Sequence, residues 1–378
     1  MAEERQKVIV LLTLLKETCS ASIVPLRESA ETTQPPSNPV SLLRKDFLSL
    51  LTLVYTSATR ISLVLRPSEP AYSASQTPIR EITAHVSGLT TCATLFDAHG
   101  KTLAETVRRS AIEVCETVAS FAQGFLNTAS SSSDTQSKED YLVRTGAVHE
   151  CIERIRKNIP ESNLAAVKAH WSQDRSMLDD SLAEVTEMIE DIGGEEDEGS
   201  DDEGFGSDDD LLDGLGLGAT KKLSAAEVDR VKKIHPLFRL TTLFYKRVSI
   251  DVLTSTQENL SQAKTRSLDA LPLKSRGLLT TSDDLVATLY APHKPPEISA
   301  AVSSFVTAFD TLYETLQTIL PPPKSEAEDL ASQLSEVTIQ GTSKKGKDVR
   351  KWFDTCYEQF HKMSTSVVDL LSAETNTT

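Results

Sequence analysis

Two pairs of adjacent aspartates come closer to catalytic chemistry than any other residues in this sequence. Asp179-Asp180 and Asp283-Asp284 resemble the carboxylate pairs that hold Mg²⁺ on facing helices of all-helical enzymes. Glu184 follows the first pair at helical spacing and could share its face, but alanine and threonine stand at the corresponding positions after the second pair. Acids near a helix start also interact favourably with the helix dipole. A metal-dependent enzyme is therefore the least favoured of the functions that the sequence suggests.

The histidines and cysteines do not form a recognisable site either. Seven histidines and five cysteines are scattered without the spacing that zinc ligation, a CxxC motif or a nucleophile elbow requires. An odd number of widely spaced cysteines is typical of a protein kept in a reducing compartment. The sequence predicts a protein that is not an enzyme and that uses no metal or cofactor.

Most of the chain reads as long helices. Apolar residues recur at alternating spacings of three and four, which keeps one apolar stripe on one helix face. The clearest stripes cover residues 43–64, 79–96, 107–125, 178–192, 298–319 and 349–370. No comparable stretch alternates with period two. The pattern predicts an all-α protein built from helical bundles. The last stripe, 349–370, could alternatively mediate self-association as a coiled coil.

Residues that start helices support the same interpretation. Asn38-Pro39 and Thr77-Pro78 place a capping side chain before a proline suited to the first helical position. Ser224 with Glu227 forms a capping-box pattern, and Gly100 is suited to end a helix. These residues predict helix boundaries at four places in the chain.

An acidic stretch separates the two helical parts. The net charge is −16, yet the window from Ser176 to Thr220 holds 17 Asp and Glu and no Lys or Arg. Its low hydrophobicity predicts a disordered linker over 193–222, between bundles at 1–192 and 223–378. The negative charge of this stretch has the wrong sign for binding nucleic acid, so no nucleic acid partner is expected. The apolar run Val8–Leu15 is shorter than a membrane span, so no membrane partner is expected.

A few residues inside the linker differ from a simple spacer. Phe205, Leu211 and Leu212 are apolar residues among acids, a composition typical of disordered segments that dock on a partner. Ser200 and Ser207 each precede a run of acids, the pattern that acid-directed kinases favour. Both interpretations stay open: a recognition segment regulated by phosphorylation, or a tether that remains solvated.

Two stretches beside the linker resemble the cyclin-D-binding protein (GCIP) family. They are "TGAVHECIERIRKNIPESNLAAVKAHWSQDRSMLDDSLAEVTEMIED" and "LSAAEVDRVKKIHPLFRLTTLFYKRV", the second followed later by "TSDDLVATLYAPHKPPEISAAV". The positions that carry the resemblance are Thr145, Gly146, Pro160, Asn163, Asp180, Glu184, Asp284, Leu285, Leu289, Tyr290 and Pro292. Their order around an acidic insert is its most specific feature.

The resemblance implies a fold, a function and a location. It implies vinculin- or catenin-like helical bundles and a non-enzymatic adaptor that restrains cell-cycle progression. The implied partners are D-type cyclins and helix–loop–helix regulators, and the implied locations are the cytoplasm and the nucleus. An adhesion-type or cytoskeletal scaffold is the second hypothesis, suggested by the bundle architecture alone.

Overall fold

The computed structural model describes residues 2–28, 38–130, 137–190, 223–256, 262–321 and 348–375. Within these ranges the regular elements are helices and there is no strand, which confirms the predicted all-α class. The chain divides into two compact units, Met1–Val167 and Lys168–Thr378. Each unit is described separately below.

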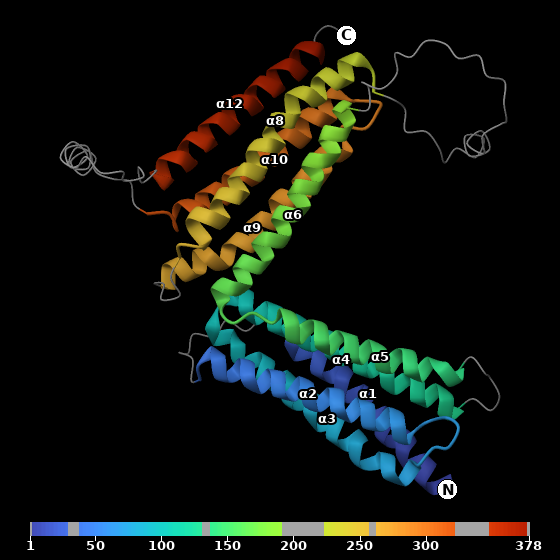
Figure 1. Ribbon diagram of the computed structural model, residues 1–378. Coiled ribbons are helices and arrows are strands. Elements are labelled where there is room, and N and C mark those ends of the chain that lie inside the picture. Colours follow the sequence, from blue (N-terminus) through green and yellow to red (C-terminus); the bar gives the residue numbers. More distant parts are fainter. Residues whose placement is uncertain are drawn as a thin grey trace, which may run out of the picture. The chain divides into compact units, whose positions relative to one another are not determined.

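The first unit is a bundle of long helices (Figure 1). Its elements are α1 (Ala2–Arg27), α2 (Val40–Val64), α3 (Tyr72–Thr94), the short 3₁₀-helix η1 (Leu95–His99), α4 (Lys101–Ser130) and α5 (Ser137–Asn158). Helix α1 packs against α3 and α4, α2 packs against α3 and α5, and α4 also packs against α5. The apolar face of each helix is thereby covered by neighbours in the same unit.

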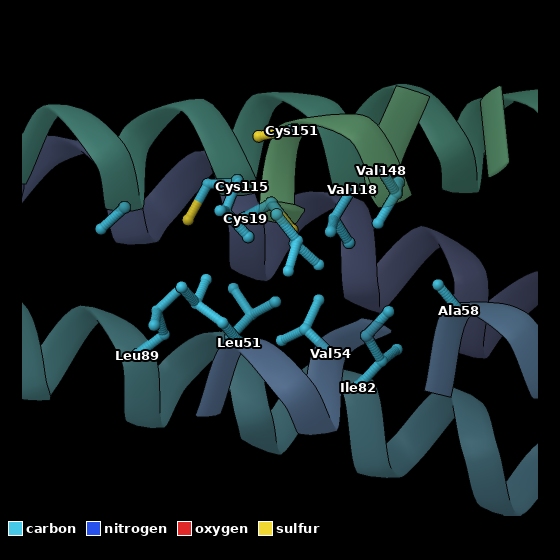
Figure 2. Packing of buried hydrophobic residues seen from close by; sticks show 14 of the residues in the cluster. Cys19, Leu51, Val54, Ala58, Ile82, Leu89, Cys115, Val118, Val148 and Cys151 are labelled. Atoms are coloured by element: carbon cyan, nitrogen blue, oxygen red, sulfur yellow. The ribbon is translucent and has the colours of Figure 1, made fainter. Parts of the chain in front are cut away.

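The core of the first unit follows the predicted stripes. Figure 2 shows Leu51 and Val54 of α2 directed into an interior that also holds Cys19 of α1 and Val118 of α4. All four side chains are fully buried. Along the stripe over 43–64, apolar side chains at three- and four-residue intervals supply the α2 part of this core. The stripe is bundle core, as predicted.

A buried ion pair joins the start of α4 to the segment before it. Arg108 donates to Asp97 Oδ2 in η1, and the two side chains are only 7% and 9% exposed. Arg108 Nη1 also donates to the backbone carbonyl of Glu28, just after α1, at 2.7 Å. One guanidinium therefore holds the end of α1, η1 and α4 together.

In the second unit, aromatic side chains from helices that are distant in the sequence pack against one another. Its elements are α6 (Asn163–Glu190), whose first residues belong to the first unit, α8 (Ala225–Arg247), the π-helical turn η2 (Val248–Leu253), α9 (Gln262–Ala287), α10 (Pro295–Gln317) and α12 (Val349–Thr375). Phe309 of α10 stacks on Phe360 of α12 with ring centroids 4.0 Å apart, and Phe244 of α8 lies 5.3 Å from Phe353. The last stripe, offered above as core or as a self-association surface, is core, since Phe353 and Phe360 are fully buried.

The domain boundary differs from the one that the sequence predicts. Residue 192 was expected to end the first bundle, whereas the contacts divide the chain at Val167. Helix α6 precedes the acidic stretch in sequence, but the indole of Trp171 stacks on Tyr245 of α8 at 4.3 Å. Thr186, near the end of α6, also lies 3.1 Å from His235 Nε2 of α8. These side chains place most of α6 in the second unit.

Two predicted helix starts are displaced and one is confirmed. Helix α3 begins at Tyr72, so Pro78 lies inside it as a buried residue, and α2 begins at Val40, with Pro39 as its N-cap. The capping box of Ser224 and Glu227 is present at the start of α8. Local capping chemistry located α8 correctly, whereas proline marked a helix start less reliably.

Two helices of the first unit are long and apolar enough to cross a membrane. They are α1 and α2. The expectation of no membrane partner considered only the shorter run Val8–Leu15, which is one part of α1. Both helices bury residues in the core of the first unit, including Leu12 and Phe47, and a buried helix of a globular bundle meets the same criteria of length and composition. Core packing therefore accounts for part of their apolar character, since 28% and 39% of the two apolar stretches are buried, while Leu14 and Leu63 are 50% and 60% exposed.

Candidate functional site

Thr145 and Gly146, two resemblance residues of the first unit, differ in their structural role. Thr145 of α5 is buried, and its hydroxyl donates to the carbonyl of Tyr141 at 2.6 Å and lies 3.1 Å from Ser62 Oγ of α2. Gly146 is exposed, and a Cβ added there would meet nothing within 4 Å. Thr145 therefore contributes to the contact between α5 and α2, while packing does not require a glycine at its neighbour.

Pro160 and Asn163 lie where α5 turns into α6. Pro160 is buried, and Asn163 is the first residue of α6. Asn163 Oδ1 accepts a hydrogen bond from the backbone N–H of Leu103 at 2.9 Å, so this side chain satisfies a free donor in the first turn of α4. The Pro–x–x–Asn sequence thus fixes the α5–α6 turn against α4.

The resemblance residues of the second unit gather at one end of it. Tyr290, just after α9, donates its hydroxyl to Glu184 of α6, and Ser181 of α6 lies 3.5 Å from Asp283 of α9. We call this place, where α6 meets the end of α9, the α6–α9 junction, formed by Ser181, Glu184, Asp283 and Tyr290. Asp180 and Asp284 are exposed beside it, and Leu285 and Leu289 are fully buried beneath it.

The electrostatics of the junction reflect its carboxylates. Burial raises the pKa of Asp283, as do the charges of Asp284 and Glu184, while the hydrogen bond from Ser181 acts in the opposite direction. The hydrogen bond to Glu184 raises the pKa of Tyr290 as well. The tyrosine hydroxyl therefore remains a donor to the carboxylate over the physiological range of pH.

A second link fastens the loop between α9 and α10 (residues 288–294, called the Pro292 loop) to the start of α8. Glu227 Oε1 accepts from the backbone N–H of His293 at 2.7 Å, and Oε2 accepts from the N–H of Ser224 at 2.7 Å. His293 follows Pro292, whose peptide bond with Ala291 is cis. The hydrogen bonds from His293 and Ser224 lower the pKa of Glu227 to about 2. The capping carboxylate thus also orders the Pro292 loop.

A buried polar network, which the sequence did not indicate, lies in the same unit. The indole of Trp171 in α6 donates to the carbonyl of Tyr245 at 3.1 Å, next to the π-helical turn η2. The hydroxyl of Tyr245 lies 2.9 Å from Ser275 Oγ of α9, which in turn bonds to Asp174 of α6. Burial raises the pKa of both Asp174 and Tyr245. Trp171, Asp174 and Leu178 follow each other at spacings of three and four residues. This spacing is the feature of the sequence from which their common helix face could have been predicted.

The residues considered for catalysis form no reactive group in the described ranges. There, no cluster of three His, Cys, Asp or Glu side chains could hold a metal ion. Asp179 pairs with Arg175 at 3.5 Å. All five cysteines are buried free thiols, and burial raises the pKa of Cys19 and Cys356 to about 12. These thiols are protonated at neutral pH and are poor nucleophiles.

The residues proposed for the linker lie outside the described part of the chain. This holds for Phe205, Leu211 and Leu212 as partner-binding residues, and for Ser200 and Ser207 as phosphorylation candidates. They therefore remain predictions. The described candidate site is the α6–α9 junction with the Pro292 loop.

Comparison with known families finds one whose models match residues on both sides of the acidic stretch. A family model described as Grap2 and cyclin-D-interacting, N-terminal, matches residues 46–191, and its C-terminal counterpart matches residues 196–314. This chain belongs to the Grap2 and cyclin-D-interacting (GCIP) family. No individual curated protein matches it. The GCIP description names two protein partners of the family, Grap2 and cyclin D. The resemblance noted from the sequence is confirmed.

The GCIP models also bear on the organisation of the chain. Their boundary falls within the acidic stretch, whereas the structural units divide at Val167. The N-terminal GCIP model therefore includes all of α6, although most of α6 packs with the helices of the second unit. The two halves of the family signature share the α6–α9 junction.

The double role of Glu227 leads to a prediction. Glu227→Ala removes acceptors from the N–H groups of Ser224 and His293, so we expect the free energy of unfolding to fall by roughly 1–2 kcal/mol. Glu297→Ala is the matched control, because Glu297 also occupies the third position of a helix but pairs only with the exposed Lys294. Its expected effect is within about 0.5 kcal/mol. Urea unfolding followed by tryptophan fluorescence measures both variants.

The same carboxylate predicts a pH dependence with a definite sign. The folded-state pKa of Glu227 lies below its ordinary value of 4.5, so its contribution is present above pH 4.5 and is lost as the pH falls towards 2. The stability difference between wild type and Glu227→Ala should therefore shrink over that interval. A difference that stays constant from pH 6 to pH 3 would contradict the charged hydrogen bonds described here.

Proposed function

We propose that this GCIP-family chain is a non-enzymatic adaptor that regulates cell-cycle progression by binding cyclin-D-type or Grap2-type proteins. The match to both halves of the family, whose description names these partners, supports the proposal. Helix–loop–helix regulators are further candidate partners by resemblance. Action in both the cytoplasm and the nucleus is part of the proposal.

We place partner binding at the α6–α9 junction, and one observation carries this assignment. Tyr290 is 45% exposed, yet its hydroxyl is held by Glu184 and the neighbouring Leu289 is fully buried. An exposed tyrosine with a fixed orientation loses little conformational entropy on binding, and tyrosine is among the residues enriched at binding hot spots. The junction thus offers an ordered aromatic contact on a rigid helical frame.

Substitution of Tyr290 tests this proposal. Tyr290→Ala should weaken capture of purified cyclin D or Grap2 by about 2 kcal/mol, roughly 30-fold in Kd, because a hot-spot aromatic is removed. Binding is measured by surface plasmon resonance with the full chain immobilised. Circular dichroism should show an unchanged helix content, since the ring is not part of the core.

Leu243→Ala provides the matched control. Leu243 of α8 is 44% exposed, nearly the same as Tyr290, and does not belong to the junction. It should leave capture unchanged. Equal loss in both variants, or full capture by Tyr290→Ala, would remove the junction as the binding site, and failure of wild type to bind either protein would refute the function itself.

A further inference from the structure

An open groove lies on the first unit between α2 and α5. Its volume is about 620 Å³. Arg44 and Lys45 of α2 line one side, and Arg156 and Lys157 of α5 line the other. Glu153 is the one carboxylate among its lining residues. The lining therefore carries a clear excess of positive charge in a chain whose net charge is −16.

The cations of the groove differ in how they are held. Arg44 Nε donates weakly to the carbonyl of Ile159 at 3.4 Å, and Arg156 pairs with Glu153 at 2.9 Å. Lys45 and Lys157 are exposed, and neither forms an ion pair or a side-chain hydrogen bond within the described part of the chain. The two arginines are thus oriented by the protein, while two ammonium groups, one on each helix, are available to an anion.

The groove suits a short acidic peptide better than a nucleic acid. Nucleic acid binding needs an extended basic footprint, and the groove offers four cations on a unit whose residues 1–167 carry 17 Lys and Arg against 18 Asp and Glu. A peptide that carries a few carboxylates can place its charge inside the groove alone. The half-buried Leu48 lies among the cations and offers an apolar contact to side chains between the acids.

We infer that the groove between α2 and α5 binds an acidic segment of a protein partner. The inference rests on the proposed adaptor function and adds a second contact of stated chemistry to it. Carboxylates of the partner pair with Lys45 and Lys157, and Arg44 and Arg156 provide oriented guanidinium donors. Because Lys45, Arg156 and Lys157 are exposed, the attraction is sensitive to ionic strength.

A charge-reversal pair tests the groove in the full chain. The probe is a fluorescein-labelled deca-glutamate peptide, and its binding is measured by fluorescence anisotropy at 20 and 150 mM NaCl. Lys45→Glu with Lys157→Glu should weaken binding at least tenfold, and wild-type affinity should fall at the higher salt concentration. Arg80→Glu with Arg109→Glu changes the net charge equally at exposed positions of α3 and α4 outside the groove, and should change affinity less than twofold.

Lys45→Gln with Lys157→Gln guards against misfolding. This pair removes the two charges without introducing repulsion and should still weaken binding several-fold with an unchanged circular dichroism spectrum. Equal losses in the groove and control pairs would show that only the overall field acts, and that result would overturn the inference. Absence of any probe binding by wild type would overturn it as well.

Two further experiments distinguish failure of this inference from failure of the proposed function, and distinguish a partner segment from the chain's own acidic stretch as the occupant of the groove. If wild type captures cyclin D or Grap2 and the groove pair captures it equally well, the inference fails and the adaptor function stands. If wild type captures neither, the adaptor function fails, whatever the probe shows. Replacing the acids of 195–210 by their amides tests the chain's own acidic stretch, and a tenfold gain in probe affinity would assign the groove to that stretch instead of a partner.

Discussion

Arg108→Met is expected to lower the free energy of unfolding of the first unit by about 3–5 kcal/mol. The substitution leaves Asp97 with its charge buried and no guanidinium beside it, since the two side chains are only 9% and 7% exposed. It also removes the donor to the carbonyl of Glu28. Both tryptophans, Trp171 and Trp352, belong to the second unit, so far-ultraviolet circular dichroism is the appropriate measurement.

An exposed ion pair of the same unit provides the control. Arg60 contacts Glu81 at 2.6 Å, but these side chains are 51% and 37% exposed, so Arg60→Met should cost no more than about 1 kcal/mol. Adding Asp97→Leu to Arg108→Met should recover most of the loss, because the uncompensated charge is then removed. An Arg108→Met variant as stable as Arg60→Met would contradict a buried pair.

Phe360→Ala should destabilise the second unit by about 3–5 kcal/mol. Phe360 is fully buried, stacks on Phe309 at 4.0 Å and lies 5.8 Å from Phe305, so truncation leaves a cavity between α10 and α12. Tryptophan fluorescence reports this unit, and the urea midpoint should shift while the transition seen by circular dichroism for the first unit stays in place.

Two variants define the range for that measurement. Phe360→Leu retains much of the apolar volume and should lose clearly less stability than Phe360→Ala. Leu273→Ala removes a side chain of α9 that is 64% exposed and should change stability by less than about 0.5 kcal/mol. If Phe360→Ala left stability intact but changed the mass of the protein in solution, the last stripe would be an interface between copies.

Much of the fold was predictable because it depends on local periodicity. The stripes through Phe47, Phe305 and Phe360 identified buried residues correctly, since spacing of three and four fixes one helix face whatever it packs against. The capping box at Ser224 was predictable for the same reason, because its two partners lie three residues apart. Such features need no knowledge of which helices become neighbours.

The remaining features depend on pairings between distant residues. Glu227 could be predicted as a cap, but its bond to His293 joins helices whose packing no local pattern specifies. The sequence groups helix α6 with the first bundle, whereas its contacts lie mostly in the second unit, because its stripe shows that it packs without showing against what, and the contact of Trp171 with Tyr245 supplies that information. Of the junction residues, Tyr290 was known only by resemblance, Ser181 was not singled out, and the structure brought Glu184 and Tyr290 together.

The turn before α4 has an evolutionary consequence. Gly100 has a φ of +114°, and a Cβ built there would lie 2.2 Å from Cγ of Asn163. Any larger residue at position 100 would meet both a backbone conformation that it rarely adopts and the side chain that caps α4. In homologous chains a residue larger than glycine at position 100 should therefore occur only where position 163 has also changed, whereas Asn163 can be replaced by another short acceptor while Gly100 is retained.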